Sequence, residues 1–184
     1  MKTKYIISGG YANRVNSDND MFFREILKDT ADTLKVLVIL FAKPDVEAEN
    51  RYMIVRKQFK RNKNDKKLEY VLATRDNFIE QIKKSDIIYI HGGETMNLIN
   101  EIKKCADFAL LVKGKVIAGE SAGSYLLSSI FYSKTIGHLE EGLGILPIKV
   151  ICHFAGLHVE KLDSIRGDLE KALLKDYQYK VYSL

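Results

Sequence analysis

One serine stands in a sequence context that could support nucleophilic catalysis. The short apolar run Lys115–Ala118 predicts a buried strand, and the next five residues read Gly-Glu-Ser-Ala-Gly before a helical pattern begins. At such a strand-to-helix turn the sharp backbone pushes the middle residue outward, so the hydroxyl of Ser121 would point into a cleft. The alternative interpretation is that Ser121 only caps the helix that follows.

A serine hydroxyl is a weak nucleophile until a base takes its proton, and His153 is the strongest candidate for that base. The apolar run Lys149–Cys152 predicts a strand that ends directly before this histidine. Parallel strands end at the same edge of a sheet, so the imidazole could reach Ser121. His158 and Glu160 form a second candidate pair, but they lie further from the end of the strand.

A pair of glycines could supply part of an oxyanion hole. Gly92 and Gly93 follow the apolar run Asp86–Ile90, at the same predicted edge of the sheet as Ser121. A glycine there can turn its backbone N–H toward the cleft, and the N–H of Ala122 would lie beside the nucleophile at a helix N-terminus. The alternative is a plain strand-to-helix turn that ends in a helix cap at Thr95.

An alternation of short apolar runs with amphipathic segments must position these residues. The runs are almost continuously apolar, which is typical of strands buried on both faces of a parallel sheet. They are Tyr5–Ser8, Val36–Phe41, Leu68–Ala73, Ile87–His91, Val116–Ala118 and Lys149–Cys152. Helical patterns begin near Ser17 and Thr95 and cover Glu47–Arg61, Asp76–Lys83 and Asp163–Leu174. The sequence therefore predicts an α/β fold, a three-layer α/β/α sandwich with a mostly parallel central sheet, built by one domain over residues 1–184.

The composition excludes several classes of protein. With 46% hydrophobic and 29% charged residues, the 184-residue chain has a globular composition. The net charge of +5 is a mild basic excess whose densest stretch, Lys57–Lys67, is typical of a solvated helix end, so we expect no nucleic acid as partner. No apolar run is long enough to cross a bilayer, and residues 1–8 do not form a signal peptide. Two cysteines without metal-ligand spacing indicate a reducing compartment, so we expect a cytoplasmic protein with no metal or other cofactor.

Three motifs in the same order resemble those of the peptidase E family, also called dipeptidase E or aspartyl dipeptidase. They are Gly92-Gly93-Glu94-Thr95, the Gly-Glu-Ser-Ala-Gly turn around Ser121, and Cys152-His153-Phe154. The resemblance implies a class I glutamine amidotransferase-like (flavodoxin-like) fold and a cytoplasmic serine hydrolase that cleaves a short peptide or related amide. It also implies Ser121 as nucleophile, His153 as base, and the N–H groups of Gly93 and Ala122 as the oxyanion hole. The implied partner is a small peptide substrate, neither nucleic acid nor a membrane is expected, and a homodimer stays open.

The sequence departs from the family pattern at two places. Glu94 stands where the family has the asparagine of a Gly-Gly-Asn-Thr motif, which puts a negative charge near the substrate loop. Family members whose third triad member is an aspartate carry it between nucleophile and base, but the segment Ser133–Gly142 holds only Glu140 and Glu141 as acids. One of these two glutamates could orient His153, or the site could be a dyad without a carboxylate. The aspartyl preference of the family is not carried over.

Two other functions are compatible with the motifs. An α/β-hydrolase esterase shares the glycine-flanked serine, but that fold places its acid before a histidine near the end of a longer chain. A second alternative is a non-catalytic or degenerate amidotransferase-like domain that binds a small molecule. A serine-hydrolase activity probe separates these classes, because only a reactive nucleophile is labelled.

Overall fold

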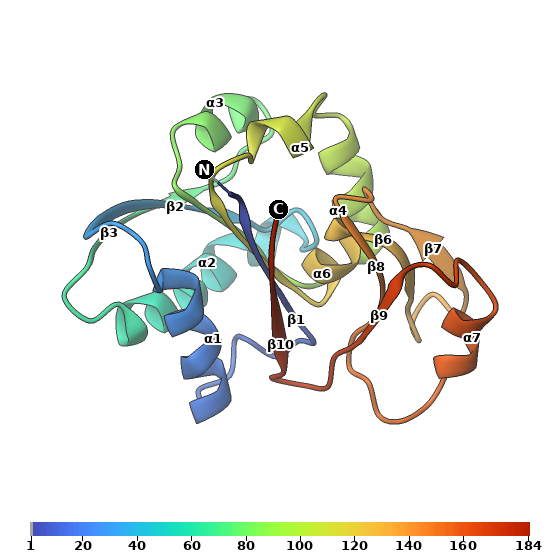
Figure 1. Ribbon diagram of the computed structural model, residues 1–184. Helices are drawn as coiled ribbons and strands as arrows, with labels where there is room; N and C mark the ends of the chain where they lie inside the picture. Colours follow the sequence, from blue (N-terminus) through green and yellow to red (C-terminus); the bar gives the residue numbers. More distant parts are fainter. Residues whose placement is uncertain (1) are drawn as a thin grey trace.

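The computed structural model describes residues 2–184 and contains two sheets (Figure 1). The central sheet has six strands in the order β10-β1-β5-β4-β2-β3. Its strands are β1 (Lys4–Ser8), β2 (Thr33–Ile39), β3 (Lys67–Leu72), β4 (Ile87–Ile90), β5 (Val116–Glu120) and β10 (Tyr179–Ser183). All neighbouring pairs are parallel except β10, which runs antiparallel to β1. The predicted mostly parallel central sheet is therefore confirmed.

Helices cover both faces of this sheet. They are α1 (Ser17–Leu27), α2 (Asp45–Asn62), α3 (Phe78–Lys83), α4 (Thr95–Lys103), α5 (Phe108–Leu111) and α6 (Ala122–Leu127), whereas α7 (Val159–Asp163) packs on the second sheet described below. Side chains alternate along β1, so Ile6 packs in one hydrophobic cluster with α1 and α2, while Tyr5 and Ile7 pack in the other with α3, α4 and α5. This arrangement is the expected three-layer α/β/α sandwich (Figure 1).

A second sheet extends the molecule beside α6, and the sequence patterns did not predict it. Its order is β7-β6-β8-β9, with β6 (Ser128–Tyr132), β7 (Leu139–Glu141), β8 (Leu146–Ile151) and β9 (Glu170–Leu173). Phe131, Ile148 and Val150 of this sheet belong to the same hydrophobic cluster as Ile7 of the central sheet. The two sheets thus share one core, and β8 ends near the central sheet.

The helix predicted over Asp163–Leu174 is wrong. In the structure α7 ends at Asp163, and β9 follows it as a parallel partner of β8. The apolar residues there fit a helical spacing, but Ala172 and Leu174 are the ones that become fully buried. Their spacing of two residues is that of a strand, so pairing with β8 overrides the helical pattern.

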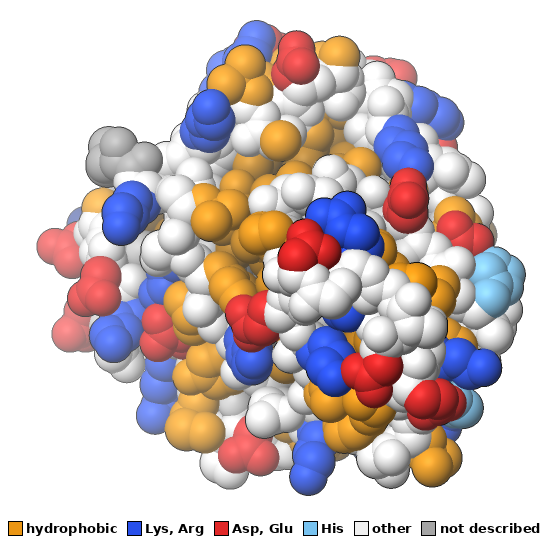
Figure 2. Space-filling model, turned by 45° about the vertical axis from the view of Figure 1, so that its right-hand side comes forward, with side chains coloured by type: hydrophobic (Ala, Val, Ile, Leu, Met, Phe, Trp, Pro, Cys, Tyr) orange, Lys and Arg blue, Asp and Glu red, His pale blue; other side chains and the backbone are white. Residues whose placement is uncertain are grey.

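No helix among residues 2–184 has the length and apolar character needed to cross a membrane. On the face drawn in Figure 2, Lys and Arg side chains are interspersed with Asp and Glu side chains and form no single basic stripe.

Candidate active site

Ser121 lies in the turn between β5 and α6, with an unusual backbone conformation. Its φ of 49° and ψ of −101° lie outside the regions that residues with side chains normally adopt. Two glycines make the turn possible: a Cβ on Gly119 would lie 2.6 Å from the carbonyl carbon of Gly123, and a Cβ on Gly123 would lie 2.6 Å from the oxygen of Ile90. The hydroxyl of Ser121 makes no capping hydrogen bond to α6, so its geometry is not that of a helix cap.

The imidazole of His153 faces this hydroxyl. Its Nε2 lies 3.1 Å from Ser121 Oγ, and its backbone N–H donates to the oxygen of Gly9 at 3.1 Å. His153 follows β8, so the structure brings together the end of a strand from each sheet. The alternative base His158 instead packs its ring against Tyr132, with the centroids 4.9 Å apart.

The carboxylate of Asp176 lies on the other side of the imidazole ring from Ser121, and the sequence did not predict it. His153 Nδ1 lies 2.6 Å from Asp176 Oδ1. Asp176 belongs to the turn between β9 and β10, which is held against the loop that follows β1 because the N–H of Tyr177 donates to the oxygen of Gly10 at 3.2 Å. Both side chains of the pair are partly exposed, His153 at 38% and Asp176 at 43%.

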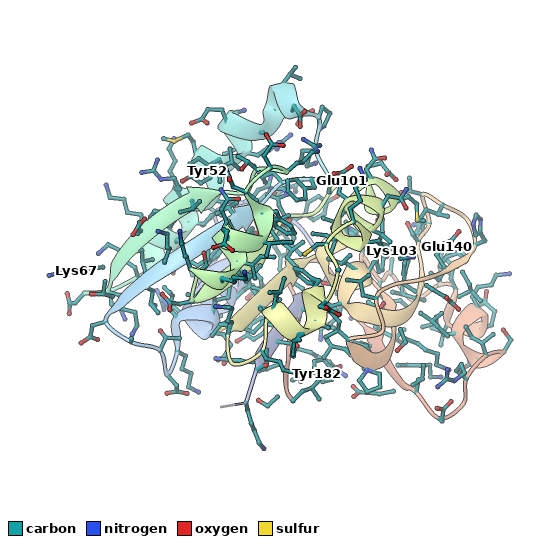
Figure 3. The ribbon with its side chains drawn as sticks, turned by 90° about the horizontal axis from the view of Figure 1, so that it is seen from above. Tyr52, Lys67, Glu101, Lys103, Glu140 and Tyr182 are labelled. Carbon is teal, nitrogen blue, oxygen red and sulfur yellow. The ribbon has the colours of Figure 1, made fainter. Side chains whose placement is uncertain are left out.

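Neither glutamate expected as the third member reaches His153. Glu140 and Glu141 lie in β7, at the outer edge of the second sheet, and Glu140 pairs with His138 Nε2 at 2.8 Å. Both line a different cavity, which they share with Lys103 of α4. Figure 3 labels Glu140 and Lys103. Between nucleophile and base, β7 pairs with β6 in an antiparallel hairpin. This pairing places Glu140 and Glu141 away from the site.

The glycine loop lies next to Ser121, as expected. Gly93 has a φ of 154°, and a Cβ there would lie 2.3 Å from the oxygen of Ala42, so only glycine fits. Ala122 is the first residue of α6, so its N–H has no partner within the helix. Glu94, and not Thr95, caps α4, because its carboxylate accepts from the N–H of Asn97 at 2.7 Å. The charge that replaces the family's asparagine therefore faces the N-terminus of a helix, where it is favourable.

Two cavities meet at the serine. The larger, about 350 Å³, is lined by Gly93, Ser121, His153, Tyr125 and residues 133–136. The smaller, about 190 Å³, shares the first three of these, and its other lining residues are Tyr11, Asn13, Lys43, Arg51, His91, Gly92 and Glu120. A substrate bound across Ser121 would thus have room on both sides of the reacting bond.

The thiol of Cys152 also borders the larger cavity, directly before His153. Burial raises the pKa of this thiol well above its usual range, so the thiol stays protonated at neutral pH. A protonated thiol is a poor nucleophile, which leaves Ser121 as the hydroxyl in line with a base. Within residues 2–184, no three His, Cys, Asp or Glu side chains gather as a metal site requires.

Comparisons with known proteins indicate the family and the fold of the chain. The family model of peptidase family S51 matches residues 6–180. A crystal structure of a peptidase from an acI-B1 Actinobacterium is similar, with a TM-score of 0.68 and 19% identity, over 100% of this chain and 84% of the other. A crystal structure of a protein described as peptidase E from Listeria monocytogenes EGD-e has a TM-score of 0.65 and 17% identity, over 100% of this chain and 98% of the other. At these identities the two structures show a common fold. No protein with a curated description matches the sequence.

Proposed function

The chain belongs to peptidase family S51, and from this premise we propose that it hydrolyses short peptides with Ser121 as nucleophile, His153 as base and Asp176 as the orienting acid. The observation that carries the proposal is the line of two close contacts, 3.1 Å from Ser121 Oγ to His153 Nε2 and 2.6 Å from His153 Nδ1 to Asp176 Oδ1. This is the arrangement of a serine triad, recognised by geometry and not by order in the chain.

The first step follows from the proton positions that these contacts favour. A carboxylate can only accept, so Nδ1 of His153 carries the proton and donates it to Asp176. Nε2 then presents a lone pair to the hydroxyl of Ser121 and accepts its proton as Oγ attacks the peptide carbonyl. The imidazolium that forms is stabilised by Asp176 and returns the proton to the leaving amine. Water then repeats the sequence on the acyl-enzyme and releases Ser121.

The negative charge that develops on the carbonyl oxygen in the transition state must be stabilised by hydrogen-bond donors. The N–H of Ala122 is free of intrahelical partners, and that of Gly93 belongs to a loop that lines both cavities beside Ser121. We assign these two groups to the oxyanion hole, because preorganised N–H donors stabilise the transition state without reorganisation.

The exposure of the acid sets how strongly it contributes. Asp176 and His153 are each more than a third exposed, so water and salt screen their interaction more than in a buried triad. We therefore expect Asp176 to contribute on the order of 10²-fold to turnover, less than the roughly 10⁴-fold of a buried acid.

The cavities support a short substrate. Volumes of about 350 and 190 Å³ fit one residue on each side of the scissile bond, which supports a di- or tripeptide over a folded protein. Ser121, Gly93 and His153 border both cavities, so the reacting carbonyl would lie at their junction.

The test is covalent labelling with a fluorophosphonate, followed by mapping of the modified residue by mass spectrometry. The wild-type protein should be labelled at Ser121, and a Ser121→Ala variant should not be labelled. Turnover of a dipeptide library by the same preparations should be lost in parallel. Absence of both labelling and turnover in the wild-type protein would support a non-catalytic binding domain instead.

A further inference from the structure

The residue before the nucleophile carries a buried carboxylate that the triad does not use. Glu120 is only 4% exposed, and its two oxygens have different partners. The backbone N–H of Ala12 donates to Oε1 at 3.2 Å, and the hydroxyl of Tyr89 donates to Oε2 at 2.9 Å. Burial raises the pKa of Tyr89 well above its usual range, so this hydroxyl keeps its proton and remains a donor.

The first of these bonds ties the β1–α1 loop, residues 9–16, to the strand that ends at Ser121. The two bonded residues are 108 positions apart in the chain, so the contact joins two otherwise separate segments. Ala12 is fully buried, and its N–H points at the carboxylate and not at water. A buried N–H without an acceptor is unfavourable, so the loop stays where Glu120 holds it.

This loop forms the wall against which His153 lies. A Cβ on Gly10 would lie 2.2 Å from the Cε1 atom of the imidazole, so the backbone of Gly10 lies directly against the ring. The ring of Tyr11 meets the imidazole edge-on, with 5.1 Å between centroids. The oxygens of Gly9 and Gly10 accept from the N–H groups of His153 and Tyr177, the neighbour of Asp176. The loop thus contacts both the base and the turn that carries the acid.

We infer that Glu120 is a positioning residue: its carboxylate fixes the β1–α1 loop on the nucleophile strand, and the loop in turn holds His153 in line between Ser121 and Asp176. The inference rests on the proposed function. The carboxylate of Glu120 is hydrogen-bonded to Ala12 and Tyr89 and not to Ser121 or His153, although Glu120 also borders the smaller cavity. Its effect passes through the loop, so it should appear in the chemical step more than in substrate binding.

Three variants separate this role from a merely structural one. Glu120→Met has a similar volume but no acceptor, so it leaves the N–H of Ala12 without a partner. Glu120→Gln keeps one acceptor oxygen for Ala12 and is the conservative rescue. Tyr89→Phe is the matched control, because it removes the other bond of Glu120 and leaves the loop anchor in place.

The readouts are kcat and KM on the best dipeptide, the rate of fluorophosphonate labelling at Ser121, the proton resonance of His153 Nδ1–H, and Tm. We expect Glu120→Met to lower kcat and the labelling rate by about 10- to 100-fold, with KM within about threefold and a broadened Nδ1–H resonance. Glu120→Gln should keep most of kcat. Tyr89→Phe should lower Tm while kcat and labelling stay within about threefold of wild type.

Wild-type kcat and labelling rate in a folded Glu120→Met variant would overturn the inference. So would equal losses in Glu120→Met and Tyr89→Phe, which would show a general effect of stability. If the Met variant does not fold, Glu120→Asp replaces it, since the shorter side chain keeps the charge but draws the carboxylate away from Ala12, and the same comparison applies. A wild-type protein that is neither labelled nor active would instead contradict the proposed function, whatever the variants do.

Discussion

Ser121 and His153 both have a positive φ, 49° and 53°, which is uncommon for residues other than glycine. Such conformations cost on the order of 1–3 kcal/mol each and persist only where the surrounding structure enforces them. Here the enforcing contacts are the close packing of Gly119 on Gly123 and the hydrogen bond from the N–H of His153 to Gly9. These backbone conformations place both side chains on the cavity side of their turns, where the hydroxyl and the imidazole can contact each other and a substrate.

This strain leads to a prediction at Ser121. Ser121→Ala should lower turnover by about 10⁴-fold or more, by analogy with other serine triads, and change stability little. Ser121→Gly should abolish turnover equally but raise the free energy of unfolding by about 1–3 kcal/mol, because glycine adopts a positive φ without strain. Urea unfolding of the two variants measures the difference. Equal stabilities of the alanine and glycine variants would show that the turn is not strained.

The acid of the triad is tested by a second set of substitutions. Asp176→Asn should lower kcat on the order of 10²-fold and leave the fold intact, because the amide no longer stabilises the imidazolium. Glu140→Gln and Glu141→Gln are the matched controls, since both lie in β7 away from His153, and each should stay within a few-fold of wild type. A larger loss in either glutamate variant than in Asp176→Asn would move the orienting acid to β7.

Among the elements, the strands with nearly continuous apolar runs could be predicted from the sequence, and the others could not. Such runs mark β1, β2, β4, β5 and β8 and also the edge strand β3, so the existence of these strands and the positions of Ser121 and His153 after two of them followed directly. In contrast, β10 is an edge strand with polar residues such as Lys180, and Val181 is 41% exposed. No apolar run marks β10, so the sequence pattern did not locate this strand or the turn before it. The position of Asp176, which lies in that turn beside His153, therefore could not be predicted. A recognisable signal was the concentration of strand-forming residues, two tyrosines and a valine, over Tyr179–Ser183.

The contact between α1 and α2 gives a prediction at the same scale. Arg61 binds both carboxylate oxygens of Asp20, at 2.9 and 3.1 Å, and these hydrogen bonds lower the pKa of Asp20 below its usual value of about 3.9. A pKa that is lower in the folded state means that the unfolded chain binds the proton more tightly. The stabilisation is therefore fully present above about pH 4 and is lost as the pH falls toward the folded-state pKa.

Urea unfolding between pH 7 and pH 2 measures this contribution. Asp20→Asn should be less stable than wild type at neutral pH, and the difference should shrink below about pH 4 as the wild-type carboxyl becomes protonated. Asp18→Asn is the matched control, because this acidic residue of the same first turn has no ion pair with Arg61. A constant difference between wild type and Asp20→Asn at all pH values would contradict the assignment.

At the scale of the whole molecule, the candidate site lies where the two sheets meet. Ser121 follows β5 of the central sheet, His153 follows β8 of the second sheet, and Asp176 lies in the segment that passes from β9 of the second sheet to β10 of the central one (Figure 1). Each group is thus fixed by a different part of the fold. The distances among them depend on how the shared core holds the sheets together.

The last prediction concerns the strand that joins the two sheets. All five residues of β10 pair with β1, and Leu184 and Thr3 exchange two further backbone hydrogen bonds. Deletion of residues 179–184 removes these bonds and turns the buried strand β1 into an edge. At about 0.5–1.5 kcal/mol for each backbone hydrogen bond, the free energy of unfolding should fall by roughly 3–9 kcal/mol. The turn with Asp176 would also lose its anchor, so fluorophosphonate labelling of Ser121 should slow at least as much as in Asp176→Asn.

Urea unfolding and labelling rates of the two variants test this prediction. Asp176→Asn should be labelled slowly at nearly full stability, whereas the deletion variant should lose both stability and labelling. A deletion variant with wild-type stability would show that the central sheet does not depend on β10, and one with wild-type labelling would separate β10 from the placement of Asp176.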